Sequence, residues 1–151
     1  MEMALVFWLA NLLPQPVADQ VCLATTVYLE ARNQSELGQR AVAEVALRRL
    51  DSGRWGDSLC EVVTAPKQFA PTLVRPDYRI VNLKAWNRAV RVALDMQTNW
   101  IGPRAQRRQI VPDADHFVAN AIASPNWAQG IPVAVIGDHT FYKVRPTTRR
   151  L

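Results

Sequence analysis

The stretch VADQVCLATTVYLEARNQSELGQRAVAEVALRRL, residues 17–50, predicts two consecutive helices. In its first half, apolar and small side chains recur at helical spacing over residues 21–29, and the pattern ends near Asn33. Ser35 can cap a second helix, whose apolar positions recur over residues 37–50. Two helices of this length, joined by a short connection, predict the central part of a mainly helical domain.

Further helices are predicted on both sides of this pair. An apolar run predicts a helix within Ala4–Leu13, and capping signals predict a short helix opened by the capping box Ser58-x-x-Glu61 and a long helix capped by Asn82. The apolar side predicted for the long helix consists of Leu83, Trp86, Ala89, Val90, Ala93, Leu94 and Gln97.

The rest of the chain predicts loops and one β element. Residues 68–78 and most of the segment after Gly102-Pro103 are rich in polar residues and prolines, which favours loops. Val133–Val144 is rich in β-branched and aromatic residues, with a possible hairpin turn at Gly137-Asp138. We therefore expect an α+β fold, mainly helical with a small C-terminal β element.

Length and composition predict one globular domain over residues 1–151, in which 1–16 form an apolar helix and a proline-containing connector. Hydrophobic residues make up 49% of the chain and charged residues 21%, values that exclude a wholly disordered protein. No apolar run approaches the roughly 20 residues that a membrane-spanning helix needs.

The net charge of +5 attracts polyanions such as nucleic acid, a membrane face or bacterial wall polymers. The basic residues cluster only weakly, in segments 104–108 and 145–150, so a solvated surface with a small positive excess also explains the charge. We expect possible contact with an anionic membrane or wall polymer and no nucleic acid partner.

Cys22 and Cys60 are too few for a disulfide framework or a four-cysteine zinc site. Each lies in an apolar helical pattern, which is typical of a free buried thiol, and we expect that state. A single bridge between the two is left open.

The first segment lacks the features of a secretory signal. Ala4–Leu13 is apolar over about ten residues, but Glu2 precedes it without a Lys or Arg, and Pro14-Gln15-Pro16 follows without a small-residue cleavage site. We expect a helix that packs on the domain and no recognisable export signal; an unusual signal or an interfacial anchor is the alternative.

Glu30 is the carboxylate with the clearest catalytic potential. It falls near the C-terminal end of an apolar helix, where burial would raise its pKa and keep it protonated enough to act as a general acid. The alternative is a surface glutamate paired with Arg32 or Arg49. Glu44, by contrast, is expected to be an exposed helix residue.

The two histidines give little support for a metal site. His116 and His139, with Asp113, Asp115 and Asp138, could in principle bind zinc, but no metal-binding spacing such as HExxH supports this. Several aromatic residues in the second half could stack on sugars or pack in a core, whereas Trp8 and Trp86 are expected in the core. These second-half aromatic residues are Phe69, Tyr78, Phe117, Trp127, Phe141 and Tyr142.

Residues 28–32, YLEAR, followed by ELGQRAVAEVAL at 36–47, resemble the signature of the SleB-type cell wall hydrolases. Four further segments resemble the family in the same order: SLCEVV at 58–63, QF at 68–69, HF at 116–117 with SPNWA at 124–128, and IGDHTFY at 136–142. The resemblance covers Cys22 to about Lys143, within a family-matching core over 17–144. Arg48 and Asn33 depart from the family, which usually has Asn and Gly at these positions.

This resemblance implies a lysozyme-like catalytic domain that cleaves the glycan strands of peptidoglycan, with Glu30 as its acid. We expect a lytic transglycosylase cutting between N-acetylmuramic acid and N-acetylglucosamine, because no second carboxylate stands out in the sequence. A hydrolytic muramidase, an amidase and a non-enzymatic basic binding module are the alternatives.

The candidate substrate contacts are Gln68, Phe69, His116, Phe117, Trp127 and Tyr142, although core packing is an equal or better explanation for each. His139 is expected to be structural. We expect a monomer that needs no metal and no cofactor. With no export signal recognised, we expect a phage endolysin that stays in the host cytoplasm until it is released to the periplasm or wall.

Overall fold

In the computed structural model the two central helices are α2, Gln15–Ala31, and α3, Glu36–Ser52, as predicted. The structure describes residues 1–66, 68–120, 125–129 and 131–144. The hydroxyl of Ser35 accepts a hydrogen bond from the N–H of Gly38 at 3.2 Å, which confirms the predicted cap. Gly53 ends α3 in the left-handed region, at φ 68°, a conformation that glycine adopts without steric cost.

The other predicted caps are confirmed as well. In α4, Leu59–Thr64, the hydroxyl of Ser58 accepts from the N–H of Glu61 at 3.1 Å. In α5, Leu83–Ile101, the side-chain oxygen of Asn82 accepts from the N–H of Ala85 at 3.0 Å. Short 3-10 turns follow at η1, Ala70–Thr72, η2, Arg104–Gln106, and η3, Asn126–Gln129.

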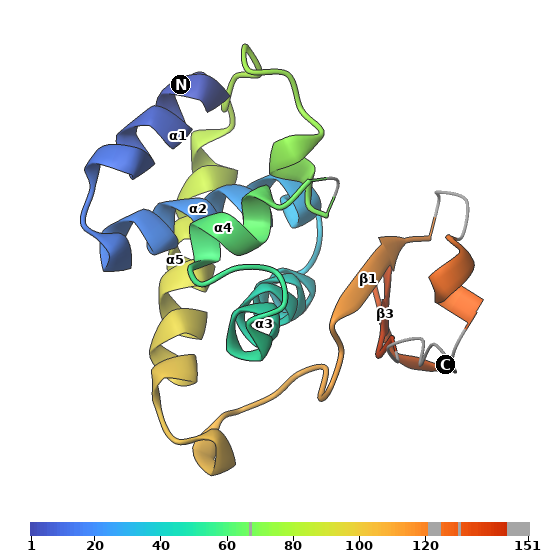
Figure 1. The fold of residues 1–151 in the computed structure, drawn as a ribbon. Helices are drawn as coiled ribbons and strands as arrows, with labels where there is room; N and C mark the ends of the chain where they lie inside the picture. The colour runs from blue at the N-terminus through green and yellow to red at the C-terminus, as the bar shows by residue number, and fades with distance from the viewer. Residues whose placement is uncertain (67, 121–124, 130, 145–151) are drawn as a thin grey trace, which may run out of the picture.

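The hydrophobic core lies around α2, which packs against α1, α3, α4 and α5 (Figure 1). The buried side of α5 coincides only in part with the predicted one. Ala89 and Ala93 are buried as predicted and Trp86 packs against the core, whereas Leu83, Val90 and Leu94 are exposed. Val92, Met96 and Trp100 are buried although they lie outside the predicted side. The indole of Trp100 lies at the C-terminal half of α3, where its N–H donates to Asp51.

A three-stranded antiparallel sheet completes the α+β fold, with β3 between β1 and β2. β2, Pro132–Ile136, and β3, His139–Tyr142, form the predicted hairpin around Gly137-Asp138. β1, His116–Ala119, lies in a segment predicted to be a loop, so that prediction is wrong. β1 has only four residues and pairs with a strand 20 or more residues further along the chain, so the local sequence pattern does not indicate a strand. Figure 1 shows the sheet to one side of the helices, beside α3.

The N-terminal helix α1, Met3–Leu12, packs on the domain as predicted. The N–H of Met3 donates to the carbonyl of Tyr78 at 2.8 Å, and Met3, Val6 and Ala10 are buried. Trp8, expected in the core, is 58% exposed, because only one side of α1 faces α2. Across the described ranges, none of the helices combines the length and apolar character that crossing a membrane would need.

Cys22 in α2 and Cys60 in α4 form a disulfide, so the expectation of two free thiols is wrong. The packing of α4 across α2 brings their Cα atoms to 5.2 Å, within the usual range for a bridge. The bond ties together two helices whose cysteines are 38 residues apart in the sequence.

Candidate active site

Glu30 occupies the last turn of α2, half-buried between the body of the helix and the segment that follows α4. Its Oε1 accepts a hydrogen bond from the backbone N–H of Ala70 at 2.6 Å. Burial raises the pKa of Glu30, and this outweighs the lowering effects of that hydrogen bond and of the positive charge of Arg49. The side chain is therefore a carboxyl group with an increased tendency to hold its proton.

Neither of the ion pairs considered for Glu30 forms within the described part of the chain. The guanidinium of Arg32 lies over the ring of Tyr28, 5.3 Å from its centroid. Arg49 acts on Glu30 through its charge, without a direct ion pair. Glu30 therefore keeps one oxygen, Oε2, without a hydrogen-bond partner among the described residues.

Arg49, predicted only as a possible surface partner of Glu30, is a buried cation of the site. Its side chain is nearly inaccessible, yet Nε donates to the carbonyl of Asp115 at 2.7 Å and Nη1 to Oε1 of Gln68 at 3.1 Å. Its guanidinium also lies over the rings of Trp55 and Phe69, at 4.6 and 4.9 Å. Burial lowers the pKa of Arg49 to about 10, so it stays charged at neutral pH.

A signal for Arg49 exists in the sequence. It follows Val42 and Val45 by seven and four residues, which places it on the apolar side of α3 rather than toward solvent. An arginine on the buried side of a helix needs hydrogen-bond partners for its donors, so this position predicts a polar network inside the domain.

Arg49 brings together two predicted site residues, Gln68 and Phe69. Gln68 is exposed apart from its bond to Arg49, so its amide can contact a ligand. Phe69 is 1% exposed and packs against Phe117, with ring centroids 6.0 Å apart. The ring of Phe69 thus belongs to the floor beneath the site.

Three further predicted residues form an aromatic cluster at the sheet. His116 on β1 is paired with Tyr142 on β3, and the ring of Trp127 lies 4.7 Å from His116 and 5.8 Å from Tyr142. The ring of Trp55 lies 5.9 Å from His116 on the side of Arg49. All four rings are half-buried, which leaves apolar faces available for stacking.

Phe117 points away from this cluster because side chains alternate along a strand. Its ring contacts Phe69, Phe141 and His139, with centroid distances between 5.4 and 6.0 Å. His139 is buried in this layer, where desolvation lowers its pKa, in keeping with the structural role predicted for it. Of the six predicted substrate contacts, Phe69 and Phe117 therefore lie in packing positions.

Asp115 is the carboxylate that organises the start of β1. Its Oδ1 lies 2.8 Å from Nδ1 of His116 and accepts from the N–H of Val144 at 2.9 Å, while Oδ2 lies 3.6 Å from Arg54. Burial alone would raise the pKa of Asp115, but these hydrogen bonds and the charges of His116 and Arg49 outweigh it, so its pKa is lowered.

Asp138 and Asp113, the other two aspartates considered as metal ligands, form no hydrogen bond or ion pair with Glu30 or Arg49 within the described structure. Asp138 is exposed in the β2–β3 turn, where it accepts from Nε2 of Gln34 at 2.9 Å. Asp113 is exposed in the loop before β1, with a positive φ of 66°. In the described ranges, no three His, Cys, Asp or Glu side chains are grouped so that they could hold a metal ion.

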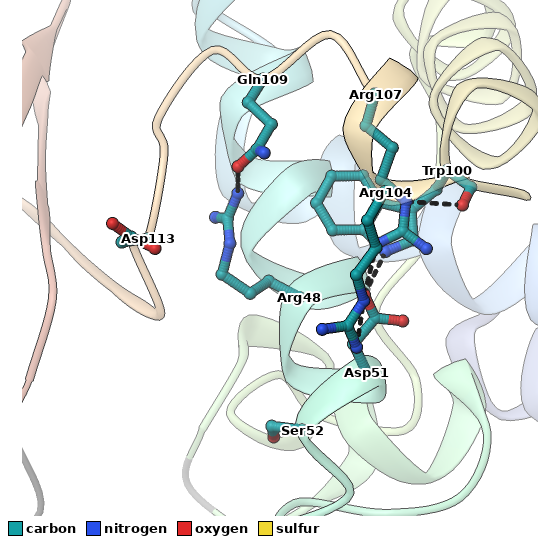
Figure 2. Close-up of a pocket in the computed structure, with 8 residues that line it drawn as sticks. All are labelled: Arg48, Asp51, Ser52, Trp100, Arg104, Arg107, Gln109 and Asp113. Atoms are coloured by element: carbon teal, nitrogen blue, oxygen red, sulfur yellow. Dashed lines mark hydrogen bonds and ion pairs between the residues drawn. The ribbon is translucent and has the colours of Figure 1, made fainter. Parts of the chain in front are cut away.

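A pocket of about 390 Å³ lies at the C-terminal end of α3 (Figure 2). Its walls come from α3, the end of α5 and the loop from η2 to Asp113. The lining residues are Arg48, Asp51, Ser52, Trp100, Arg104, Arg107, Gln109 and Asp113. Three arginines and two aspartates make it strongly polar.

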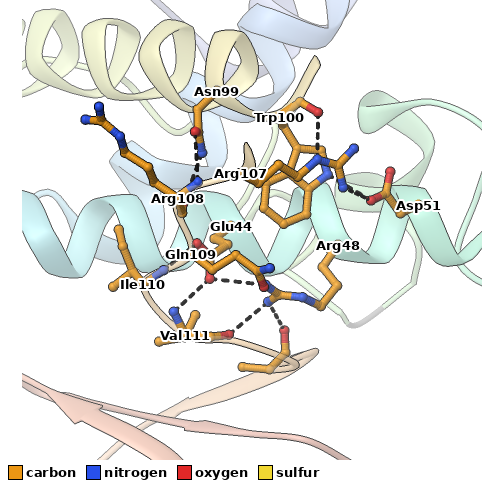
Figure 3. Close-up of polar contacts among 11 residues, drawn as sticks. Glu44, Arg48, Asp51, Asn99, Trp100, Arg107, Arg108, Gln109, Ile110 and Val111 are labelled. Carbon is orange, nitrogen blue, oxygen red and sulfur yellow. Dashed lines mark hydrogen bonds and ion pairs between the residues drawn. The ribbon is translucent and has the colours of Figure 1, made fainter. Parts of the chain in front are cut away.

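A buried carboxylate fixes the loop that separates this pocket from the sheet (Figure 3). Glu44, expected to be exposed, is fully buried and accepts from the N–H groups of Ile110 and Val111, both at 2.7 Å. Arg48 pairs with Glu44 at 3.2 Å and donates to the carbonyls of Val111 and Ala114 at 3.1 and 2.6 Å. The prediction for Glu44 is wrong because helical spacing alone cannot show that a distant loop covers this position.

Comparison with known protein families gives a match to the cell wall hydrolase family over residues 33–142. The match covers more than half of the chain, so the chain belongs to this family, as its resemblance to the SleB-type enzymes implied. It is therefore a cell-wall-degrading enzyme whose substrate is peptidoglycan. Among curated proteins and among solved structures, no match was found. The matched range contains Arg49 and the six candidate substrate contacts and begins three residues after Glu30.

Proposed function

We propose that this protein cleaves the glycosidic bond between N-acetylmuramic acid and N-acetylglucosamine as a lytic transglycosylase, with Glu30 as general acid and then general base. The observation that carries the proposal is the half-buried Glu30, whose pKa is raised by desolvation and whose Oε1 is fixed by the N–H of Ala70. Cleavage of a glycosidic bond requires an oriented carboxyl group that can hold a proton and donate it, and a raised pKa favours that state.

In the first step, Oε2 of Glu30 donates its proton to the oxygen that links the two sugars. Oε1 already accepts the hydrogen bond from Ala70, so Oε2 is the oxygen free to carry the proton. The C1–oxygen bond of the muramic acid breaks, the leaving sugar takes the proton, and positive charge develops at C1. The N–H of Ala70 and the charge of Arg49 stabilise the carboxylate that remains.

In the second step, the same carboxylate removes the proton from the C6 hydroxyl of the muramic acid. The C6 oxygen then bonds to C1 and closes a 1,6-anhydro ring, so no water is consumed and Glu30 is protonated again. One carboxyl group serves both steps.

Both carboxylate oxygens of Asp115 already have partners, and this favours lytic transglycosylation over hydrolysis. A hydrolytic muramidase needs a second carboxylate, about 5–5.5 Å from the first in retaining enzymes and about 6.5–9.5 Å in inverting ones. The charge of Arg49 acts on both Glu30 and Asp115, but the carboxylate oxygens of Asp115 already interact with His116, Val144 and Arg54. Its ionised state supports the hydrolytic muramidase as the second candidate.

The disulfide argues against a cysteine-dependent amidase and supports an enzyme that acts in an oxidising compartment. A bridged cysteine offers no thiolate nucleophile, so neither Cys22 nor Cys60 can attack an amide while the bridge is intact. Disulfides persist mainly in oxidising compartments, which supports an enzyme that works outside the cytoplasm, where peptidoglycan lies. The phage origin and the route of release stay predictions.

The test is mass spectrometry of purified peptidoglycan digested by the wild-type protein and by Glu30→Gln. Glu36→Gln is the matched control, because Glu36 is an exposed residue paired with Arg40 on the surface of α3. We expect 1,6-anhydro-muropeptides from the wild type and from Glu36→Gln, and none from Glu30→Gln.

The other products separate the alternatives. Muramic acid with a reducing end would replace the lyase by a hydrolase and direct attention to Asp115. Free stem peptides, released equally by Glu30→Gln, would show an amidase and remove Glu30 from the mechanism.

A further inference from the structure

We infer that the pocket at the end of α3 binds a carboxylate of the peptide substituent on the glycan strand, with Arg104 as its principal cation. This inference rests on the proposed function, since it adds a peptide subsite beside the glycan site. The ligand class is an acidic peptide attached to muramic acid.

The pocket has hydrogen-bond donors that the described residues leave without partners. Arg104 is 78% exposed and reaches only the margin of an ion pair, with Nη2 4.0 Å from Oδ2 of Asp51. Arg107 uses Nε for the carbonyl of Trp100 and Nη1 for Asp51, so its Nη2 has no hydrogen-bond partner in the described part of the chain. Guanidinium groups bind carboxylates with two parallel N–H donors, so this pair suits a carboxylate.

Arg107 is held in place by internal contacts. Oδ2 of Asp51 accepts from the indole N–H of Trp100 at 3.0 Å and pairs with Arg107. The guanidinium of Arg107 in turn lies 4.3 Å from the ring centroid of Trp100. A ligand would therefore meet an Arg107 that needs no rearrangement, and only Arg104 would lose side-chain freedom.

Asp113 faces the same pocket from the opposite wall (Figure 2). Its side chain makes no hydrogen bond or ion pair with the described residues. An exposed carboxylate can accept from a peptide N–H or an ammonium group. Free guanidinium donors on one wall and a free carboxylate on the other match a peptide better than a simple anion.

Both walls of the pocket lead along the chain to residues of the candidate glycan site. Ser52 lines the pocket, and Trp55, three residues on, contacts His116 and Arg49 in the glycan site. Asp113 lines the pocket and also lies three residues before His116. Three residues of extended chain span at most about 11 Å, so a strand seated on the aromatic cluster places its substituents near the pocket.

The experiment compares intact peptidoglycan with the same material after an amidase has removed the stem peptides. Wild-type protein, Arg104→Glu and Arg91→Glu are assayed for kcat/KM on both substrates at low ionic strength, where exposed charges are least screened. Arg91 is an exposed arginine of α5 outside the pocket, so its variant carries the same change in net charge.

We expect the wild type to prefer the intact substrate and Arg104→Glu to reduce that preference roughly five- to tenfold, as loss of a charge-assisted hydrogen bond would. Arg91→Glu should keep the wild-type preference. Equal changes on both substrates in Arg104→Glu, or no wild-type preference, would overturn the inference.

A binding assay separates this result from the proposed function. Glu30→Gln protein, with and without Arg104→Glu, is sedimented with both forms of peptidoglycan. Arg104→Glu should weaken sedimentation with the intact form only, even if the wild type cleaves neither substrate. Failure to cleave would refute the proposed function, whereas unchanged sedimentation would refute the peptide subsite.

Discussion

Arg49 changes the pKa of Glu30 through its charge, although the two side chains form no ion pair. Burial raises the pKa of Glu30, and the charge of Arg49 works against that increase. Burial favours the protonated carboxyl group needed in the first step and makes its carboxylate a stronger base for the second, while the charge of Arg49 limits the rise in pKa and stabilises the carboxylate between the two steps. Arg49 is therefore a positioning residue, which holds Gln68 and the chain at Asp115 and acts on Glu30 by its charge.

Two substitutions of Arg49 should separate the effect of its charge from the effect of its hydrogen bonds. Arg49→Gln removes a positive charge, so the pKa of Glu30 rises further and the alkaline limb of the kcat/KM profile moves to higher pH. Arg49→Lys keeps the charge and should keep that limb near the wild-type position. Both variants lose the planar set of donors and should cost about 1–3 kcal/mol in free energy of unfolding. An unchanged limb in Arg49→Gln would show that Arg49 has only a structural role.

The pKa of Glu30 also predicts a pH-dependent difference in stability. Since the pKa is raised on folding above the ordinary value of 4.5, the stabilisation from protonated Glu30 is fully present below pH 4.5 and is lost as the pH rises through the folded pKa. Glu30→Gln, which is neutral throughout, should therefore unfold at a higher temperature than the wild type at pH 7. Thermal unfolding followed by circular dichroism at pH 7 and pH 4 tests this: the difference should shrink at pH 4.

Among the elements, the loop from η2 to β1 depends most on contacts with a distant helix. Glu44 and Arg48, one turn apart on α3, supply the partners for four backbone groups of this loop. The loop leads directly into Asp115 and His116. The network on α3 therefore fixes the position of β1, and through it the aromatic cluster.

Glu44→Gln tests this role of α3. The amide keeps the shape of the side chain but loses the charge and one acceptor, so a buried N–H of Ile110 or Val111 loses its partner. We expect a loss of about 2–4 kcal/mol in free energy of unfolding, measured by denaturant titration. Glu36→Gln, on the exposed side of the same helix, should stay within about 0.5 kcal/mol of the wild type. A similar small change in Glu44→Gln would mean that other contacts hold the loop.

The caps at Ser35, Ser58 and Asn82 show what local sequence determines, because each acts within three residues of itself. β1, the buried Glu44 and the disulfide were not predicted, since each depends on a partner 20 or more residues away. The same difference holds for the site. The role of Glu30 could be predicted from the apolar pattern of its own helix, whereas the role of Arg49 depends on residues that only folding brings close to it.

In the whole molecule, the disulfide is the covalent link between the helix that carries Glu30 and the helix that leads to Ala70. Cys22 lies two turns before Glu30 on α2, and Cys60 lies on α4, which precedes the segment whose N–H binds Glu30. The bridge thus restrains both halves of the contact that orients the carboxyl group.

Loss of the bridge should lower stability and activity together. For a loop of 38 residues, the chain-entropy model gives about 4 kcal/mol of stabilisation at 25 °C. Cys22→Ser with Cys60→Ser, or reduction of the wild type, should therefore lower the unfolding midpoint in guanidinium chloride, while the paired-serine variant itself should not respond to reductant. Cleavage of peptidoglycan measured with and without reductant should fall in parallel, because Ala70 is then held less firmly against Glu30. A wild type whose stability and activity are both indifferent to reductant would show that the bridge contributes nothing to the site, and it would withdraw the support that the disulfide gives to action in an oxidising compartment.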